Sequence, residues 1–154
     1  MSTETLSQQI LTDETIQLVG FQLGNEEFGI DITIIQEINR VPYITRVPNA
    51  PPHVRGVMNL RGKTLPVMDL RIRMNLSASE YTDDTRIIVV KMRDDVIGFI
   101  VDSVTEVLRI ASGSVEEPPD FLKTIDTEFI QSVCKINNKL LILLDLNKII
   151  DKEQ

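Results

Sequence analysis

The feature that most constrains the fold of this chain is an internal repeat. Segment 29–41 matches segment 98–110 at a shift of 69 residues, and segment 63–70 matches segment 139–146 at a shift of 76. The aligned residues keep their chemical character, as in the pairs Glu37 and Glu106, Arg40 and Arg109, and Asp69 and Asp145. Such self-similarity indicates two copies of one supersecondary unit. The change of shift places an insertion in the loop 111–128 of the second copy.

Each copy begins with a pattern typical of strands. Apolar and other residues alternate between positions 16 and 23, and again between 28 and 32, with Gly24-Asn25-Glu26 between them. Alternation with a period of two, interrupted by turn residues, predicts a β-hairpin. After it, Thr33 and Gln36 have the spacing of a capping box, so we expect a short helical turn before Asn39.

A second hairpin is predicted in the stretch that contains three prolines. Pro48, Pro51 and Pro52 fix φ and lack a backbone donor, so the approach to His53 should be irregular. A strand should then run from Val54 to Leu60, turn at Arg61-Gly62-Lys63, and return over 64–70. This places Asn59 and Arg61 at the mouth of the turn, where their side chains need partners.

The duplication predicts an all-β fold of two SH3/OB-like barrels with five strands each. The first barrel should span about 16–75 and the second about 85–145, with a C-terminal helix at about 145–151. Residues 1–15 should form a disordered tail, and the polar segment 75–84 should link the copies. A barrel of roughly 65 residues is marginal alone, so the two should pack around a shared core.

Composition narrows the possible functions. The 154 residues carry 23 acidic and 16 basic side chains, a net charge of −7, without Trp. Nucleic-acid modules need a basic surface with stacking aromatics, so nucleic acid is not an expected partner. No run of about 20 apolar residues occurs, so membrane insertion is not expected and the protein should be cytoplasmic. The single cysteine, Cys134, agrees with a reducing compartment.

The residues that could carry catalysis are few. His53 is the only histidine and lies in a proline-rich loop, and Cys134 lies in an apolar segment that predicts a buried strand. The acidic pairs at 83–84 and 94–95 lack the ladder of oxygen ligands of a calcium loop. We therefore expect no enzyme activity, no catalytic residue, no metal site and no cofactor.

Three polar residues of the first copy remain unexplained: Glu37, Asn59 and Arg61. Glu37 and Arg61 can form a local ion pair at a barrel rim, which would contribute little to stability. Alternatively, an arginine among apolar neighbours has the composition of a protein-binding hot spot. In the second copy the residue aligned with Arg61 is Asn137, so the hairpin is repeated without its guanidinium. That difference between the copies favours a role for Arg61 in binding over a purely structural role.

Several motifs together resemble one protein family. They are Asn49-Ala50-Pro51-Pro52, the run from Gly56 to Leu70, the segment 24–32, Gln36-Glu37-Ile38 and the segment 96–102. Over residues 16–150 this pattern resembles the CheW family of bacterial chemotaxis coupling proteins. The resemblance implies two five-stranded barrels around a shared core and a non-catalytic adaptor. Such an adaptor joins the helical cytoplasmic tip of methyl-accepting chemoreceptors to the regulatory domain of the histidine kinase CheA.

The resemblance also assigns residues to partners. Receptor contacts would come from a groove between the barrels, formed by Ile35, Glu37, Ile44, Gly56, Asn59, Arg61 and Val107. Kinase contacts would come from Ile44, Arg46 and Val47, and from Phe121 in the inserted loop. The protein would be a monomer in isolation and would be recruited to membrane-associated receptor arrays. Arg86 departs from the expected pattern, since an apolar residue would suit the start of a strand better.

Two alternatives remain open at this point. The same module could be the coupling half of a CheV-like protein or a kinase fragment, although no receiver or kinase segment is present in the sequence. From another class, it could be an acidic barrel that binds a ligand or an oligonucleotide, unrelated to chemotaxis.

Overall fold

The computed structural model describes residues 15–118 and 127–151. Its eleven described strands are β1 (Thr15–Leu23), β2 (Glu26–Asp31), β3 (Ile35–Arg40), β4 (Val54–Leu60), β5 (Lys63–Asp69), β6 (Arg86–Met92), β7 (Asp95–Val101), β8 (Ser103–Ala111), β9 (Val115–Glu116), β10 (Ile130–Ile136) and β11 (Lys139–Leu144). The described helices are η1 (Ile32–Ile34), α2 (Leu70–Arg73), η2 (Ser112–Ser114), η4 (Thr127–Phe129) and α3 (Leu146–Asp151). The predicted C-terminal helix is present as α3. The predicted tail, apart from Thr15, and Phe121 lie outside the described residues. No described helix has both the length and the apolar character needed to cross a membrane.

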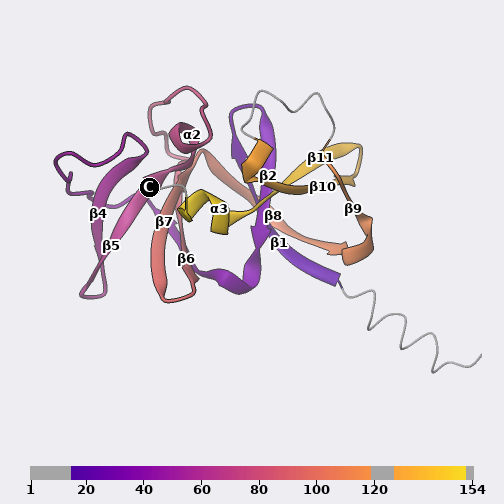
Figure 1. Cartoon of the computed structure of the whole chain (residues 1–154), viewed down its shortest axis with the longest axis horizontal. Coiled ribbons are helices and arrows are strands. Elements are labelled where there is room, and N and C mark those ends of the chain that lie inside the picture. Colours follow the sequence, from indigo (N-terminus) through magenta and orange to yellow (C-terminus); the bar gives the residue numbers. More distant parts are fainter. Residues whose placement is uncertain (1–14, 119–126, 152–154) are drawn as a thin grey trace, which may run out of the picture.

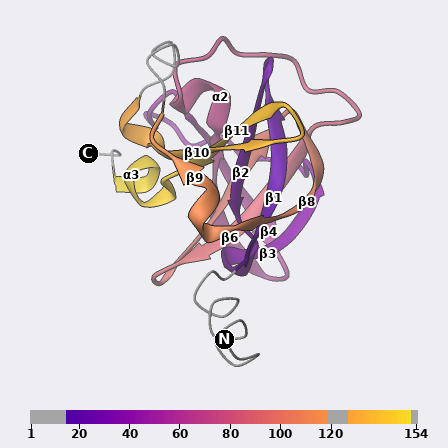
Figure 2. The same cartoon turned by 90° about the vertical axis from the view of Figure 1, so that its right-hand side faces the viewer.

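The strands form two sheets, which lie side by side in Figure 1. The six-stranded sheet has the order β8-β1-β2-β11-β10-β9 and faces the viewer in Figure 2. The five-stranded sheet has the order β3-β6-β7-β5-β4. The predicted all-β class with two β units is confirmed, and the repeat is visible in the elements, because β1–β3 correspond to β6–β8 and β4–β5 to β10–β11.

The predicted division of these strands between 16–75 and 85–145 is wrong. The first-copy strands β1 and β2 pair with β8 and β11, while the second-copy strands β6 and β7 pair with β3 and β5. The six-stranded sheet therefore combines two strands of the first copy with four of the second, and the five-stranded sheet combines three of the first with two of the second. The repeat identifies the unit but not its pairing, because an alternating strand can bury its apolar face against either copy.

The predicted helical turn occurs earlier than expected. Asp31, not Thr33, caps η1, since its Oδ1 accepts a hydrogen bond of 2.9 Å from the Thr33 N–H. Gln36 belongs to β3, whose residues alternate between half-buried and exposed from Ile35 to Arg40. β-Branched side chains at these positions favour a strand over a helix. The consequence for the site is that Glu37 and Asn39 lie on the same face of one strand.

Apolar side chains form three clusters. The largest lies between the sheets and includes Phe21 and Phe28, which are stacked with ring centroids 5.8 Å apart, together with Phe99 of the other sheet. A second cluster, with Met58 and Val67, lies within the five-stranded sheet, and a third, with Leu18, lies within the six-stranded sheet. The structure thus contains the expected shared core and a smaller interior for each sheet.

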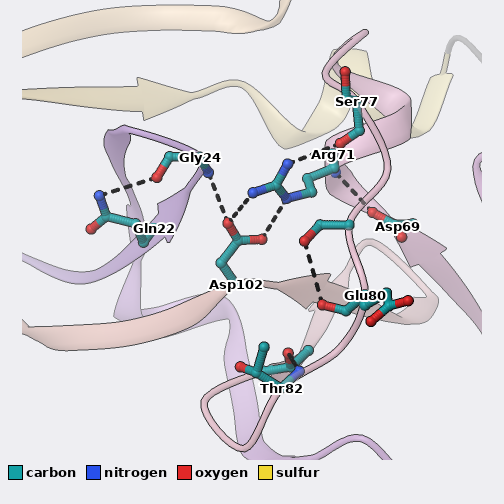
Figure 3. A network of polar contacts seen from close by, with 10 residues as sticks. Gln22, Gly24, Asp69, Arg71, Ser77, Glu80, Thr82 and Asp102 are labelled. Atoms are coloured by element: carbon teal, nitrogen blue, oxygen red, sulfur yellow. Dashed lines mark hydrogen bonds and ion pairs between the residues drawn. The ribbon is translucent and has the colours of Figure 1, made fainter.

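A network of polar side chains connects the two sheets beside this core (Figure 3). Arg71 of α2 binds Asp102 in a two-pronged ion pair, with Nε–Oδ1 and Nη2–Oδ2 distances of 2.7 and 2.6 Å. Asp102 Oδ2 also accepts a hydrogen bond of 2.8 Å from the N–H of Gly24, in the β1–β2 turn. Arg71 donates a further bond to the carbonyl of Ser77. One carboxylate therefore connects both sheets and the segment that follows α2.

A short bridge extends the five-stranded sheet beyond β4. Thr45 and Val57 exchange two backbone hydrogen bonds of 2.8 Å each. The bridge requires Gly56, which has a φ of +146°, and a Cβ on Gly56 would lie 2.0 Å from the carbonyl oxygen of Thr45. A larger residue would push the bridging segment away.

Candidate functional site

The site is built on the β4–β5 turn, which lies where the sequence predicted it. Arg61 and Gly62 occupy its two central positions with φ values of +53° and +83°. Positive φ at both positions is the geometry that joins two strands with their natural twist. Asn59 Oδ1 accepts a 3.1 Å hydrogen bond from the N–H of Gly62, which gives Asn59 its partner. Arginine is uncommon in this backbone conformation, so Arg61 is not explained by the turn alone.

Arg61 pairs with Glu37 across the gap between β3 and the turn. Its Nη1 donates to Glu37 Oε2, and Asn39 Nδ2 donates to Glu37 Oε1 over 2.9 Å. The hydrogen bond from Asn39 and the charge and hydrogen bond of Arg61 outweigh the effect of burial and lower the pKa of Glu37. The carboxylate is therefore charged and held from two sides at neutral pH.

The two partners differ in their access to solvent. The Arg61 side chain is 77% exposed, whereas that of Glu37 is 17% exposed. A guanidinium has five N–H donors, and Glu37 is the only acceptor for Arg61 among the residues that the structure describes. Arg61 is therefore fixed in direction by Glu37 and can still donate to another molecule.

A groove of about 480 Å³ lies next to this pair. Three of its lining residues are apolar, and six are charged, with both signs present. The apolar residues are Leu60, Leu65 and Val96, and the charged residues are Glu37, Arg61, Lys63, Lys91, Asp94 and Asp95. The groove joins three segments that are distant in sequence: the start of β3, the β4–β5 turn and the β6–β7 turn, which lie at the lower ends of the strands in Figure 1. A mixture of apolar residues and charges of both signs is the composition of a polar protein-binding surface rather than that of a mostly apolar ligand pocket.

The remaining residues predicted to contact a receptor lie apart from this groove. Ile35 is half-buried against the shared core, and Ile44 is half-buried against the core of the five-stranded sheet. Gly56 is buried beneath Thr45. Val107 lies on β8 of the six-stranded sheet and is 56% exposed. The structure thus brings Glu37, Asn59 and Arg61 together but does not join the other four to them in one pocket.

The residues predicted to contact a kinase lie around the Thr45 bridge. Arg46 and Val47 are exposed, and they line a second, smaller groove of about 400 Å³ with the prolines of the 48–52 segment. Ile44 precedes the bridge on the same segment. Phe121, the fourth residue of this set, lies outside the described residues.

Sequence reasoning missed Asn39, Lys91 and Val96. Asn39 lies two residues after Glu37, so a strand interpretation of 35–40 would have placed both side chains on one face. Lys91 and Val96 belong to the second copy, and only the exchange of strands between copies brings them to the groove. No signal in the sequence indicates that exchange.

The rest of the described chain adds no catalytic geometry. The carbonyl of His53 accepts a 2.7 Å hydrogen bond from the N–H of Asp69, and Cys134 is buried as a free thiol. Across residues 15–118 and 127–151, no three side chains of His, Cys, Asp or Glu are grouped so as to hold a metal ion.

Comparisons with known proteins agree on one family. Residues 17–154 match the family described as CheW-like domain. The chemotaxis protein CheW of Klebsiella aerogenes is 35% identical over 98% of this chain and 86% of its own length, and that of Bacillus subtilis is 36% identical over 96% and 94%. The crystal structure of the scaffolding protein TtCheW from Thermoanaerobacter tengcongensis is 36% identical, with a TM-score of 0.81 over 88% of both chains.

Proposed function

We propose that this chain, which belongs to the CheW-like domain family, couples methyl-accepting chemoreceptors to the histidine kinase CheA. The family predicted from the sequence motifs is confirmed, and a chemotaxis adaptor without enzyme activity is favoured over an oligonucleotide-binding barrel. The observation that carries the proposal is the outward-facing Arg61, paired with a Glu37 that Asn39 also holds, in a groove of mixed apolar and charged lining. In this arrangement the groove would take apolar side chains of the receptor's helical tip, and Arg61 would donate to its polar groups.

The other predicted receptor residues have different parts in this proposal. Ile35, Ile44 and Val107 would extend the contact as apolar surface, and Asn59 would act by fixing the turn that carries Arg61. Gly56 would act indirectly, because it allows the close approach of Thr45. A hot spot of this kind concentrates binding energy in one or two central residues, with weaker contacts around them.

The kinase would bind around the Thr45 bridge, where Ile44 borders both proposed contacts. Ile44, Arg46 and Val47 would contact its regulatory domain, and Phe121 would contact a second kinase molecule so that rings of adaptor and kinase can close. Substitution of Phe121 by Ser should then reduce array assembly while one-to-one kinase binding persists. The adaptor would be cytoplasmic, monomeric in isolation, and recruited to membrane-associated arrays through these two partners.

Co-sedimentation with receptor-containing membranes tests the proposal directly. The wild-type chain should pellet with the membranes, and more of it should pellet when the kinase is added. Arg61→Ala should stay largely in the supernatant, whereas the control Asn137→Ala, at the aligned turn position, should pellet like the wild type. Equal pelleting of both variants and the wild type would contradict the role of Arg61, and no pelleting of the wild type would contradict the adaptor function.

A further inference from the structure

An arginine-lined cleft of about 560 Å³ lies beside the Thr45 bridge and shares only part of its lining with the proposed kinase contacts. Its lining includes Arg40, Arg46, Arg55, Tyr43 and Tyr81, with Asp83 as the only carboxylate. The chain as a whole has a net charge of −7. Arg55 interacts with the charge of the buried Asp69, so Arg40 and Arg46 are the arginines that give the cleft a positive charge against the overall charge of the protein.

One cross-strand pair of residues at the cleft destabilises the fold. Arg40 of β3 lies directly opposite Arg86 of β6, and like charges in this position are destabilising. Arg86 turns to the backbone, where its Nη1 donates to the carbonyls of Asp83 and Thr85 over 2.7 and 2.9 Å. Arg40 and Arg46 have no ion pair within the described residues. An arrangement that weakens the fold and leaves two guanidinium groups unpaired is typical of a binding site.

Aromatic side chains complete the cleft. Tyr43 is 86% exposed and Tyr81 39% exposed, and the guanidinium of Arg55 lies 5.8 Å from the centroid of the Tyr81 ring. Tyrosine and arginine are the residues most enriched at the centres of protein interfaces. The cleft therefore has the composition of a peptide-binding surface rather than that of a site for a small ion.

The backbone beside the cleft offers a second means of recognition. Thr45 directs both its N–H and its C=O toward Val57 of β4. In an antiparallel ladder the flanking residues face the opposite way, so the backbone groups of Ile44 and Arg46 point away from β4. No backbone hydrogen bond of Ile44 or Arg46 is present among the described residues. An extended peptide can pair with such groups as an added strand.

We propose that this cleft binds an extended acidic segment of a protein partner, whose carboxylates pair with Arg40 and Arg46 while its backbone adds to the 44–46 segment. The inference rests on the proposed adaptor function in one respect, that the ligand is a protein. It goes beyond that function by assigning the chemistry of the ligand and by adding Arg40, Arg55 and Tyr81 to the contact. The outward-facing backbone groups of the 44–46 segment favour a peptide over a membrane or a nucleic acid, because only a peptide can pair with them as an added strand.

A peptide titration followed by NMR tests this inference on the full chain. The probe is a blocked hexapeptide of alternating Glu and Val, and the control peptide has Gln in place of each Glu. The acidic peptide should shift the amide signals of 44–46 and Tyr81, and added salt should weaken its binding. The double variant Arg40→Glu with Arg46→Glu should weaken binding at least about tenfold. The matched control is Arg109→Glu, which changes the aligned arginine on exposed β8 and should bind as the wild type does.

Stability measurements separate binding from folding. Arg40→Glu removes the like-charge opposition with Arg86, so it should melt at or above the wild-type temperature although it binds less peptide. The inference is overturned if the Gln peptide binds equally well, if Arg109→Glu weakens binding as much, or if phosphatidylserine vesicles shift the same signals and the acidic peptide does not. Failure of the peptide while receptor co-sedimentation persists would overturn this inference alone, and the reverse result would overturn only the adaptor function.

Discussion

The β4–β5 and β10–β11 turns have the same backbone but different side chains. Arg61 and Gly62 have φ values of +53° and +83°, and Asn137 and Asn138, at the aligned positions, have +51° and +65°. Asparagine adopts this conformation more readily than arginine. The fold therefore needs positive φ at both turns, but it needs a guanidinium at neither. Arg61 is therefore present for a reason other than the turn.

The strands that lie near the two turns show the same division. Glu37 is held by Arg61 and Asn39, whereas the aligned Glu106 is exposed and has no ion pair within the described part of the chain. By contrast, the residues that precede the two short helices cap them in both copies. Asp69 and Asp145 each accept a hydrogen bond from a backbone N–H of the helix that follows. The residues that the two copies share stabilise the fold, and the residues that differ between them lie on the surface.

The largest expected effect comes from Gly56→Ser, which introduces the residue that the second copy has at the aligned position, Ser132. The new Cβ would lie 2.0 Å from the Thr45 carbonyl oxygen, and the φ of +146° would be strained. We expect a loss of about 3–5 kcal/mol in the free energy of unfolding, measured by urea denaturation. The control Ser132→Gly should cost less than about 1 kcal/mol. A loss of similar size in both variants would show that the two copies do not differ here.

The second-largest effect is expected from Arg61→Ala, which should weaken receptor binding. We expect receptor affinity to fall about 30- to 1,000-fold, the range of a truncated hot spot, with little change in melting temperature. Affinity is measured by titration of receptor-containing membranes, and Asn137→Ala serves as the control. An early melt combined with normal coupling would move Arg61 from the binding surface to the scaffold.

Asp102→Ala should break the connection between the two sheets. The Asp102 and Arg71 side chains are 28% and 19% exposed, so we expect a loss of about 1.5–3 kcal/mol in the free energy of unfolding. Asn147, which aligns with Arg71, is neutral and accepts a 3.2 Å hydrogen bond from Arg93, so the control Asn147→Ala should cost less than about 1 kcal/mol. Equal losses would mean that the charge of Asp102 contributes nothing.

The same ion pair predicts a pH dependence. Burial would raise the pKa of Asp102, but hydrogen bonds from Arg71 and Gly24 and the charge of Arg71 outweigh it, so the pKa is lowered on folding. The stabilisation is therefore present above the pKa of the unfolded chain, about 3.9, and is lost as the pH falls through the lower folded pKa. The difference in unfolding free energy between the wild type and Asp102→Ala should shrink below about pH 4. A constant difference would contradict this account.

The smallest effect is expected from Asn137→Arg, which gives the second turn the arginine of the first. The left-handed backbone should make this substitution cost about 0.5–1 kcal/mol, or a few degrees in melting temperature. In an Arg61→Ala background it should not restore receptor binding, because Leu108 occupies the place of Asn39 beside Glu106. Restored binding would show that the turn alone, without its neighbouring strand, makes the site.

The residues differ in how far the sequence could predict their places. The turn at Arg61 follows from a local pattern and was predicted correctly, and the ion pair of Glu37 with Arg61 is one of the two alternatives that the sequence left open. The isoleucines at 34, 35 and 38 fit a helix as well as a strand, so Asn39 was not placed beside Glu37. Lys91 and Val96 could not be placed at all, because the partner of a strand depends on contacts far along the chain. Local chemistry was therefore predictable, and the wall of the groove contributed by the other copy was not.

The exchange of strands between the copies also determines which sheet can form first during synthesis. Residues 35–101 contain every strand of the five-stranded sheet, so that sheet can close as soon as β7 leaves the ribosome. The hairpin of β1 and β2 is synthesised first, yet its partners β8 and β11 arrive about 70 and 110 residues later, roughly 4–22 s at ordinary rates of translation. An isolated hairpin is marginally stable in water. The earliest strands of this protein must therefore wait, with Phe21 and Phe28 unburied, for nearly the whole period of synthesis.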